Sequence, residues 1–337
     1  MKIGVVGAGG WGTALADLLA RSGHDVAIWC YEEEVARAIE LKRENEAYLP
    51  GISLSDNIKS TTDIEEAVTG GEIVVSVSPS HAVRKVMGDA SPFVSSDAVV
   101  LNASKGIENE SLLTMSQVLA EVIEDGVRIA ALSGPSFALE VAKGHPTVVS
   151  AACKDEDVAT LIQQTFSNKR FRVYAGEDVI GLEIGGSIKN VMAIAAGICD
   201  GLGFGTNTRA ALITRGLAEM TRLAVKMGAH PLTMAGLGGL GDLVLTCTGD
   251  LSRNRQVGLK LGSGMKIDEI LAEMRMVAEG VKTTRSAHDL AAREEIEMPI
   301  VDAVYHIIYE NKSPKDVVFE LMTRGLKREI DTYVPTG

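Results

Sequence analysis

Short apolar runs alternate with longer amphipathic stretches along the first half of the chain. Such runs predict buried strands, whereas apolar positions three and four residues apart predict helices. The predicted strands cover residues 2–6, 25–29, 58–60, 72–77, 97–102, 127–132, 147–152 and 171–174. The predicted helices between them include residues 13–21, 32–43, 63–68 and 155–166. Because strand and helix alternate, we expect a doubly wound α/β domain with a parallel sheet.

The pattern changes near residue 177, after which almost no strand signal remains. Helical periodicity, interrupted by glycine-containing loops, covers residues 176–199, 207–227, 239–246, 253–261, 281–294, 299–310 and 315–322. We therefore expect a dinucleotide-binding-type α/β domain at residues 1–178 and an all-helical substrate-binding domain at residues 179–337. Since no linker-like segment separates them, we expect a packed junction with the active site in the cleft.

A glycine-rich loop joins the first predicted strand to the first predicted helix. It reads Gly7-Ala8-Gly9-Gly10-Trp11-Gly12. Gly7 permits a tight turn, Gly9 lets the backbone approach a pyrophosphate, and Gly12 lets the helix pack closely on the strand. The free N–H groups of the helix start then face the anion. The motif alone is weak, but between a strand and a helix it predicts a Rossmann-like domain that binds a dinucleotide.

The residues after the second predicted strand bear on the choice between NAD and NADP. Glu32, Glu33 and Glu34 lie where an acidic residue meets the ribose hydroxyls of NAD. No Lys or Arg occurs between Arg21 and Arg37 to meet a 2′-phosphate. This favours NAD weakly. The alternative, that the three carboxylates are the solvated first turn of a helix, stays open.

Composition and charge narrow the class of protein. The chain has 337 residues, 46% of them hydrophobic, and a formal net charge of −12 at pH 7. This charge argues against a nucleic-acid partner, and an anionic substrate would need a local positive site. We see no apolar run long enough to cross a bilayer and no cleavable leader, so we expect a cytoplasmic protein. The four cysteines are widely spaced, which predicts reduced, mostly buried thiols and no metal site: Cys30, Cys153, Cys199 and Cys247.

Two predicted strands end in loops with candidate ligand-binding groups. Lys105 follows one strand within Ala103-Ser104-Lys105-Gly106, and a lysine there is well placed to meet an anion or a carbonyl oxygen. Another strand ends in Ser133-Gly134-Pro135-Ser136, whose N–H groups and hydroxyl would point at a ligand. Ligands gather at the carboxyl ends of strands in such sheets, so the loop Ser78-Pro79-Ser80-His81, after the predicted strand at residues 72–77, is expected to face the cofactor.

Lys189 is the candidate acid–base group. It lies in a long apolar helix rich in small residues, between residues 181 and 196. Burial disfavours the charged amine and lowers its pKa, which makes the group usable near neutral pH. A lysine that extends from the side of a helix to solvent is the alternative. Asp242, in a second glycine-rich loop, could orient Lys189 or accept a hydrogen bond from a substrate hydroxyl.

The segment Ser252-Arg253-Asn254 has the form of a phosphate site. Ser252 is a predicted N-cap, Arg253 can bind two oxyanion oxygens, and Asn254 adds an amide at a helix N-terminus. The alternative is a capped surface helix with a solvated arginine. We favour the phosphate-binding site over the capped surface helix.

Taken together and in this order, several segments resemble the bacterial type of the NAD(P)-dependent glycerol-3-phosphate dehydrogenase family over almost the whole chain. They are residues 7–14, 104–107, 133–138, 189–190, 241–242, 252–254 and 277–281. The resemblance implies interconversion of sn-glycerol 3-phosphate and dihydroxyacetone phosphate, for glycerophospholipid synthesis. One departure is that Cys30-Tyr31-Glu32 stands where many members carry a basic residue, so the cofactor preference stays open.

The resemblance also implies roles for individual residues. Lys189 would be the proton donor or acceptor. The substrate would contact Lys105, Gly134, Ser136, Lys189, Asp242, Ser252, Arg253 and Asn254. The cofactor would contact the fingerprint residues Gly7, Gly9, Gly10, Trp11 and Gly12, and also Lys105, Ala138, Arg253, Val277 and Glu279.

Two other functions are considered. A lysine-dependent 3-hydroxy acid dehydrogenase of the same architecture would need an anion site for a carboxylate, and the Ser252 segment suits phosphate better. A regulator that senses NAD without turnover would have no need of Lys189, Asp242 and Lys105 together. The sequence leaves the oligomeric state open, with a homodimer as one option.

Overall fold

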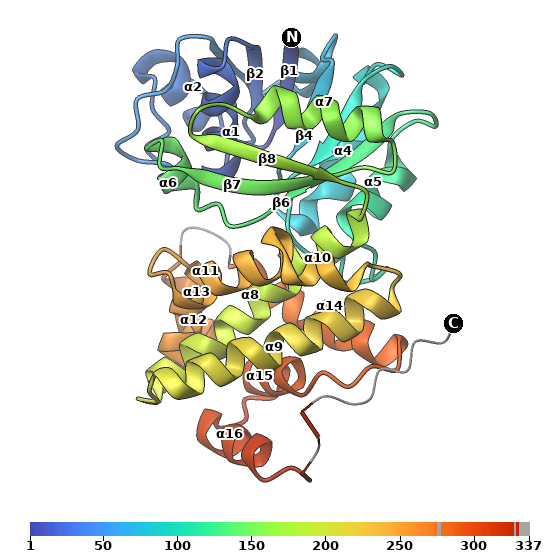
Figure 1. Cartoon of the computed structure of the whole chain (residues 1–337). Coiled ribbons are helices and arrows are strands. Elements are labelled where there is room, and N and C mark those ends of the chain that lie inside the picture. The colour runs from blue at the N-terminus through green and yellow to red at the C-terminus, as the bar shows by residue number, and fades with distance from the viewer. Residues whose placement is uncertain (275–277, 327, 330–337) are drawn as a thin grey trace, which may run out of the picture.

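The computed structural model describes residues 1–274, 278–326 and 328–329 and contains two regions with different secondary structure (Figure 1). The first is one eight-stranded sheet in the order β3-β2-β1-β4-β5-β6-β7-β8. Its strands are β1 (Lys2–Val6), β2 (Asp25–Trp29), β3 (Ile58–Thr61), β4 (Ile73–Ser76), β5 (Val99–Asn102), β6 (Arg128–Ser133), β7 (Thr147–Ala152) and β8 (Phe171–Gly176). The expected α/β doubly wound fold followed by a helical region is confirmed.

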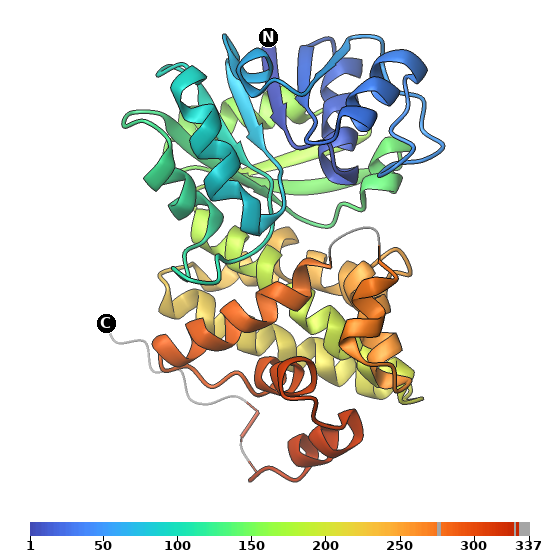
Figure 2. The ribbon, with the colours of Figure 1, turned by 180° about the vertical axis from the view of Figure 1, so that it is seen from behind.

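Helices cover both faces of the sheet, as Figures 1 and 2 show from opposite sides. One face packs on α1 (Gly10–Arg21), α2 (Glu33–Lys42), α6 (Ala138–Ala142) and α7 (Glu156–Phe166). The other packs on α3 (Ile64–Val68), α4 (Val83–Ala90) and α5 (Met115–Val122). In β4, Ile73 and Val75 face the first core and Val74 the second. Because both faces are buried, the strands are continuously apolar.

The expectation of a wholly parallel sheet is wrong at one edge. β7 pairs antiparallel with β6, and β8 pairs parallel with β7. The short helix α6, five residues long, is the only helix between β6 and β7. It spans about 8 Å, whereas the six-residue β6 spans about 20 Å, so it is too short to carry the chain back along the whole strand. A parallel crossover needs such a return, and β7 therefore runs in the opposite direction.

The second region contains only helices among the described residues. They are α8 (Val179–Gly201), α9 (Thr206–Lys226), α10 (Pro231–Ala235), α11 (Asp242–Thr248), α12 (Arg253–Gly262), α13 (Ile267–Ala272), α14 (Glu279–Arg293), α15 (Pro299–Tyr309) and α16 (Pro314–Met322), together with a π-helical turn at Leu237–Gly241. The short helices α10 and α13 were not predicted. The predicted helix at 239–246 is divided between the π turn and α11.

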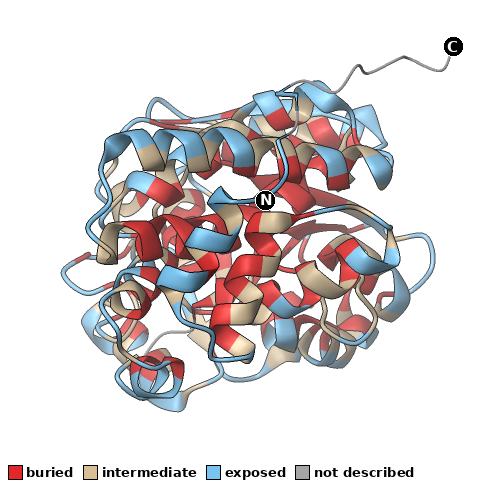
Figure 3. Ribbon diagram, turned by 90° about the horizontal axis from the view of Figure 1, so that it is seen from below, coloured by how far each residue is buried: buried red, intermediate tan, exposed pale blue. Residues whose placement is uncertain are grey.

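Helix α8 is the core of the helical region. Among the described residues it is the one helix long and apolar enough to cross a bilayer, so the expectation of no such run is wrong on length and composition. However, 89% of its apolar window is buried inside the protein. Its apolar character therefore reflects packing on all sides. Across the whole molecule, Figure 3 shows buried residues towards the inside and exposed residues on the outer helices.

Glycines bring α8 and α12 together along their backbones. A Cβ at Gly258 would overlap the carbonyl oxygen of Ile194, and a Cβ at Gly197 would overlap that of Arg255. Gly201 and Gly262, one turn further along, are equally restricted. The small residues that the sequence shows in α8 therefore permit a backbone contact that any side chain would prevent.

Candidate active site

Two neighbouring strand ends supply one wall of the candidate site. β5 ends at Asn102 and β6 at Ser133, so the loops that follow lie at the same edge of the sheet. Lys105 Nζ donates to the carbonyl oxygen of Gly134 at 3.2 Å. Gly134 has a φ of 146°, and a Cβ there would lie 2.9 Å from the Cα of Val149. Glycine is required at this turn because both its conformation and its space exclude a side chain.

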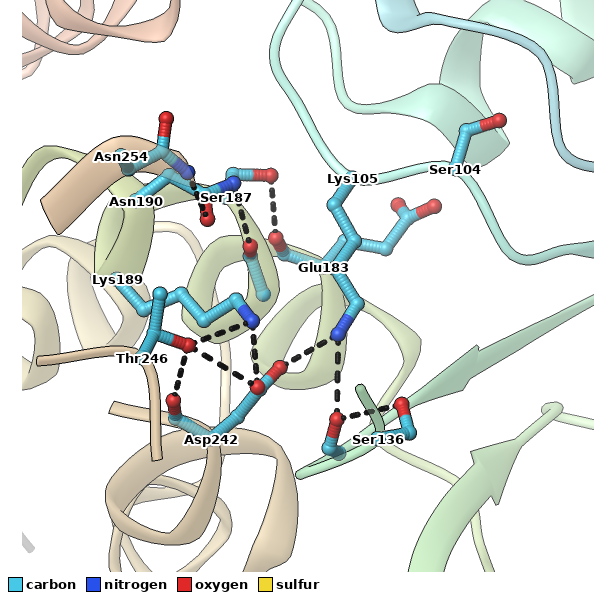
Figure 4. A network of polar contacts seen from close by, with 12 residues as sticks. Ser104, Lys105, Ser136, Glu183, Ser187, Lys189, Asn190, Asp242, Thr246 and Asn254 are labelled. Atoms are coloured by element: carbon cyan, nitrogen blue, oxygen red, sulfur yellow. Dashed lines mark hydrogen bonds and ion pairs between the residues drawn. The ribbon is translucent and has the colours of Figure 1, made fainter. Parts of the chain in front are cut away.

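Helix α8 supplies the second lysine and α11 the carboxylate between the two (Figure 4). Lys189 Nζ donates to Asp242 Oδ1 at 2.5 Å and to Thr246 Oγ1 at 3.0 Å. Lys105 Nζ donates to the other oxygen of Asp242 at 2.6 Å. Asp242 is fully buried and Lys189 is 6% exposed. The alternative of a lysine that extends to solvent is therefore wrong for Lys189.

The surroundings of Lys189 bring the pKa of its amine close to neutral pH. Burial lowers the pKa of Lys189 from 10.5 to about 7, Asp242 acts in the opposite direction, and the ammonium of Lys105 lowers it further. One carboxylate shared by two ammonium groups cannot stabilise both fully. The amine can therefore take up and release a proton in the physiological range.

Thr246 belongs to this cluster and was missed in the sequence. Its hydroxyl donates to the backbone carbonyl of Asp242 at 2.6 Å and accepts from Lys189. It stands four positions after Asp242 in the same helix, which places both side chains on one face. That spacing is the signal that could have identified it.

The start of α12 is linked to Lys189 through the next residue of α8. Asn254 Nδ2 donates to Asn190 Oδ1 at 2.9 Å, and the N–H of Gly280 donates to Asn254 Oδ1 at 3.0 Å. Ser252 is the N-cap of α12, as expected, and its hydroxyl accepts from the N–H of Arg255 at 3.2 Å. The Asn254 amide thus joins α8, α12 and α14 and fixes the helix start beside Lys189.

The fingerprint loop has the geometry that a dinucleotide requires. Gly7 has a φ of 128°, a Cβ at Gly9 would meet open space, and a Cβ at Gly12 would overlap the Gly7 carbonyl oxygen. α1 already begins at Gly10, so the last two glycines lie in its first turn. Trp11 Nε1 is buried without a hydrogen-bond partner among the described residues. A buried donor without a partner, in the first turn of a helix, is suited to hold a polar ligand.

The other expected cofactor residues lie on several elements. Ala138 is the first residue of α6, and a Cβ at Gly10 would lie 3.9 Å from its Cβ. Glu279 opens α14 and accepts from Ser80 Oγ at 2.6 Å. Ser136, expected to contact the substrate and not the cofactor, donates from its Oγ to the carbonyl oxygen of Gly134 at 3.0 Å. Val277 lies outside the described residues.

The three glutamates after β2 differ in their surroundings. Glu33 and Glu34 form the exposed first turn of α2, and Glu33 pairs with Arg37 at 3.4 Å. Glu32 is the N-cap residue and accepts from the hydroxyl of Tyr48 at 2.6 Å. The solvated-turn interpretation holds for Glu33 and Glu34, and Glu32 remains the candidate for a ribose contact.

A separate cavity of about 660 Å³ lies between α1, α6 and the loop before β8, and none of the predicted site residues lines it. Two of its basic side chains, Arg21 and Lys143, stand at helix C-termini, where cations complement the helix dipole, and two others, Lys169 and Arg170, lie in the loop before β8. We therefore place the chemistry at the Lys189 cluster. Within the described residues no group of three or more His, Cys, Asp or Glu side chains could hold a metal ion, and all four cysteines are free and buried.

Two protein-family models match the chain. Residues 2–159 match the model described as NAD-dependent glycerol-3-phosphate dehydrogenase N-terminus, and residues 178–319 match the corresponding C-terminus. A protein of Citrifermentans bemidjiense named glycerol-3-phosphate dehydrogenase (NAD(P)+) is 57% identical over 97% of this chain and 98% of its own length. The protein of that name from Geobacter sulfurreducens is 56% identical over the same shares.

A solved structure has the same fold over nearly the full length. The crystal structure of glycerol-3-phosphate dehydrogenase from Coxiella burnetii is 40% identical, with a TM-score of 0.92. The similarity covers 96% of this chain and 99% of that one.

Proposed function

Because the chain belongs to the NAD-dependent glycerol-3-phosphate dehydrogenase family, we propose that it interconverts sn-glycerol 3-phosphate and dihydroxyacetone phosphate. It is an oxidoreductase that uses NAD or NADP. The observation that carries the proposal is the buried Lys189, whose pKa is lowered to about 7 beside Asp242 and Lys105. The reaction moves one hydride and one proton, and such a lysine supplies the proton. The product would serve glycerophospholipid synthesis.

The fingerprint loop and the start of α1 would hold the cofactor. The N–H groups of the first helical turn would meet the pyrophosphate, and the open space at Gly9 would leave room for it. When bound, the nicotinamide supplies or accepts the hydride at C2 of the substrate. The further contacts proposed are Gly7, Gly10, Trp11, Gly12, Lys105, Ala138, Arg253, Glu279 and, outside the described residues, Val277.

Lys189 is the proposed general acid and base. In the direction of reduction its ammonium donates a proton to the C2 oxygen of dihydroxyacetone phosphate. In the direction of oxidation its neutral amine removes the hydroxyl proton of glycerol 3-phosphate. Asp242 and Thr246 orient the amine, since both are within hydrogen-bond distance of Nζ. Lys105 lies on the other oxygen of Asp242 and would hold the substrate.

The start of α12 is the proposed phosphate site. The first-turn N–H groups and the guanidinium of Arg253 would meet the phosphate oxygens, and Ser252 and Asn254 would add a hydroxyl and an amide. Asn190 ties this helix start to the residue next to Lys189. Gly134 and Ser136 would contact the substrate from the sheet side.

We also propose two domains, a cytoplasmic location and a homodimer. The division at residues 178 and 179 is supported by the last strand, which ends at Gly176, and by α8, which begins at Val179. The substrate is a small molecule. The protein would be located in the cytoplasm and form a homodimer. Free, buried thiols are compatible with a reducing compartment.

The test is an absorbance assay of the purified protein with dihydroxyacetone phosphate and NADH or NADPH. We expect oxidation of the cofactor that depends on both substrates. Turnover of a 3-hydroxy acid without turnover of dihydroxyacetone phosphate would support the hydroxy-acid alternative. Binding of the cofactor without any turnover would support the NAD-sensing regulator instead.

A further inference from the structure

Glu183 is a buried carboxylate that takes no part in the proton and hydride transfers proposed above. It lies on α8, which also carries Lys189, and is 6% exposed. Burial raises its pKa, whereas hydrogen bonds from Ser116, Thr114 and Asn102 act in the opposite direction. A buried carboxylate is costly unless several donors satisfy it, so the partners of Glu183 are informative.

Those partners belong to the sheet region and not to the helical region. Glu183 Oε1 accepts from Asn102 Nδ2 at 2.6 Å and from the N–H of Ser116 at 2.8 Å. Glu183 Oε2 accepts from Ser116 Oγ at 2.6 Å. Ser116 lies in the first turn of α5, where the helix dipole favours a negative charge. Glu183 therefore fixes α8 to the end of β5 and to the start of α5.

Asn102 transmits this contact to the turn before Lys105. Its side chain accepts from the N–H of Ser104 at 3.0 Å and donates to the carbonyl oxygen of Ser104 at 3.2 Å. Ser104 Oγ in turn donates to the carbonyl oxygen of Ser78 at 2.6 Å. The backbone immediately before Lys105 is thus held on both sides. A Cβ at Gly186 would lie 3.7 Å from Lys105 Cδ, so the lysine stem runs along α8.

We propose that Glu183 is a positioning residue for the reaction proposed above. Its carboxylate accepts a hydrogen bond from Asn102 and so holds the turn before Lys105 against α8. The Lys105 ammonium then lies between Asp242 and the Gly134 carbonyl. Figure 4 shows Glu183, Lys105 and Asp242 close together, with Lys105 donating to Asp242. Without the hydrogen bond between Glu183 and Asn102, Lys105 loses its fixed position near Lys189.

The proposal has a measurable electrostatic consequence. The charged groups that act on Lys189 are Asp242 on α11 and Lys105 on the loop after β5. Lys105 lowers the pKa of Lys189, so its displacement raises that pKa. A residue that only stabilises the fold would change the melting temperature without this effect.

The main test is Glu183→Gln, measured by the pH dependence of glycerol 3-phosphate oxidation. An amide offers one oxygen to three donors and turns an NH2 group towards another donor. We expect the apparent pKa of kcat to rise by roughly half a unit or more, and the KM for glycerol 3-phosphate to rise. The matched control is Glu219→Gln, because Glu219 is also buried and accepts from the N–H groups of Ile300 and Val301. It should leave the apparent pKa unchanged.

Asn102→Ala tests the same link from the other side and carries the test if Glu183→Gln does not fold. It should raise the apparent pKa in the same direction. In a Lys105→Met background, Glu183→Gln should cause no further rise, because the charge it positions is gone. A wild-type apparent pKa and KM in Glu183→Gln and Asn102→Ala would overturn the proposal. If the wild-type protein does not oxidise glycerol 3-phosphate, the proposed function itself is wrong.

Discussion

At the scale of single residues, Asp242 accepts from two ammonium groups in a place that water barely reaches. Its two oxygens lie 2.5 Å from Lys189 Nζ and 2.6 Å from Lys105 Nζ. The cluster therefore carries one positive charge more than the carboxylate can balance. Because desolvation penalises that charge, the proton of Lys189 is released near pH 7 instead of near 10.5.

We expect Lys189→Ala to lower kcat by roughly 10²-fold or more, the usual effect of losing a general acid or base. The dissociation constant of the cofactor should stay nearly constant, because the fingerprint loop is untouched. In the wild type, oxidation needs the neutral amine, so its kcat should rise with pH and level off above about 7. Reduction needs the ammonium and should fall above that pH. A kcat close to wild type in the variant would contradict the assignment.

Arg253 should contribute to binding of the phosphate group. We expect Arg253→Ala to weaken binding of dihydroxyacetone phosphate by about 1.5–3 kcal/mol, the range for a charge-assisted hydrogen bond. This corresponds to an increase in KM of roughly 10- to 150-fold. Glycerol has no phosphate, so its slower turnover should change far less and serves as the control. An unchanged KM for dihydroxyacetone phosphate would move the phosphate site elsewhere.

At the scale of elements, the turn from β2 into α2 bears on the cofactor preference. Glu32 is held by the Tyr48 hydroxyl, and Glu34 is exposed in the first turn of α2. We expect NADH to be used at least as well as NADPH, because this negative field repels a 2′-phosphate.

Glu32→Ala should raise the ratio of kcat/KM for NADPH to that for NADH. Glu34→Ala removes the same charge two residues further along the chain, in the exposed first turn of α2, and is the matched control. A larger effect of Glu32→Ala would indicate a specific contact at the ribose. A strong NADPH preference in the wild type, unaltered by either change, would show that these carboxylates do not face the cofactor.

The contact between α8 and α12 offers a test of packing. Gly258→Ala places a Cβ on the Ile194 carbonyl oxygen, and neither backbone can move without separating the two helices. We expect the free energy of unfolding to fall by about 3 kcal/mol or more, at the upper end of overpacking effects. Gly205→Ala is the control, because a Cβ at Gly205 meets no atom within 4 Å and its φ of −86° suits alanine. Equal denaturant midpoints for the two variants would contradict this account.

At the scale of the whole molecule, a buried carboxylate links stability to pH. Burial raises the pKa of Glu219 from 4.5 to about 7, although the N–H groups of Ile300 and Val301 oppose the change. The folded state therefore binds this proton more tightly than the unfolded chain does. The contribution to stability is fully present below pH 4.5 and is lost as pH rises through about 7.

We expect the free energy of unfolding of the wild type, relative to Glu219→Gln, to fall across that window. The change should be up to roughly 3 kcal/mol, since each pKa unit corresponds to about 1.4 kcal/mol. Urea denaturation of both proteins at several pH values measures it. A constant difference between pH 4.5 and pH 7 would contradict the raised pKa.

The sequence alone was sufficient for the strands, most of the helices and the dinucleotide loop. These features depend on neighbours in the chain: an apolar run buried on both faces becomes a strand, and Gly7, Gly9 and Gly12 meet requirements of one turn and one helix start. The lowered pKa of Lys189 was also predictable, because its neighbours in α8 are almost all apolar.

Tertiary structure decided the direction of β7 and the composition of the site. The turn at α6 reverses the last two strands because a five-residue helix cannot return the chain along β6. Residues 105, 189 and 242 meet only because α8 packs on the ends of β5 and β6 while α11 closes over it. Glu183 had no sequence signal, since its donors at Asn102 and Ser116 are more than 60 residues away. A side chain whose partners lie far along the chain acquires its role only when packing excludes water and leaves those partners as its only hydrogen bonds.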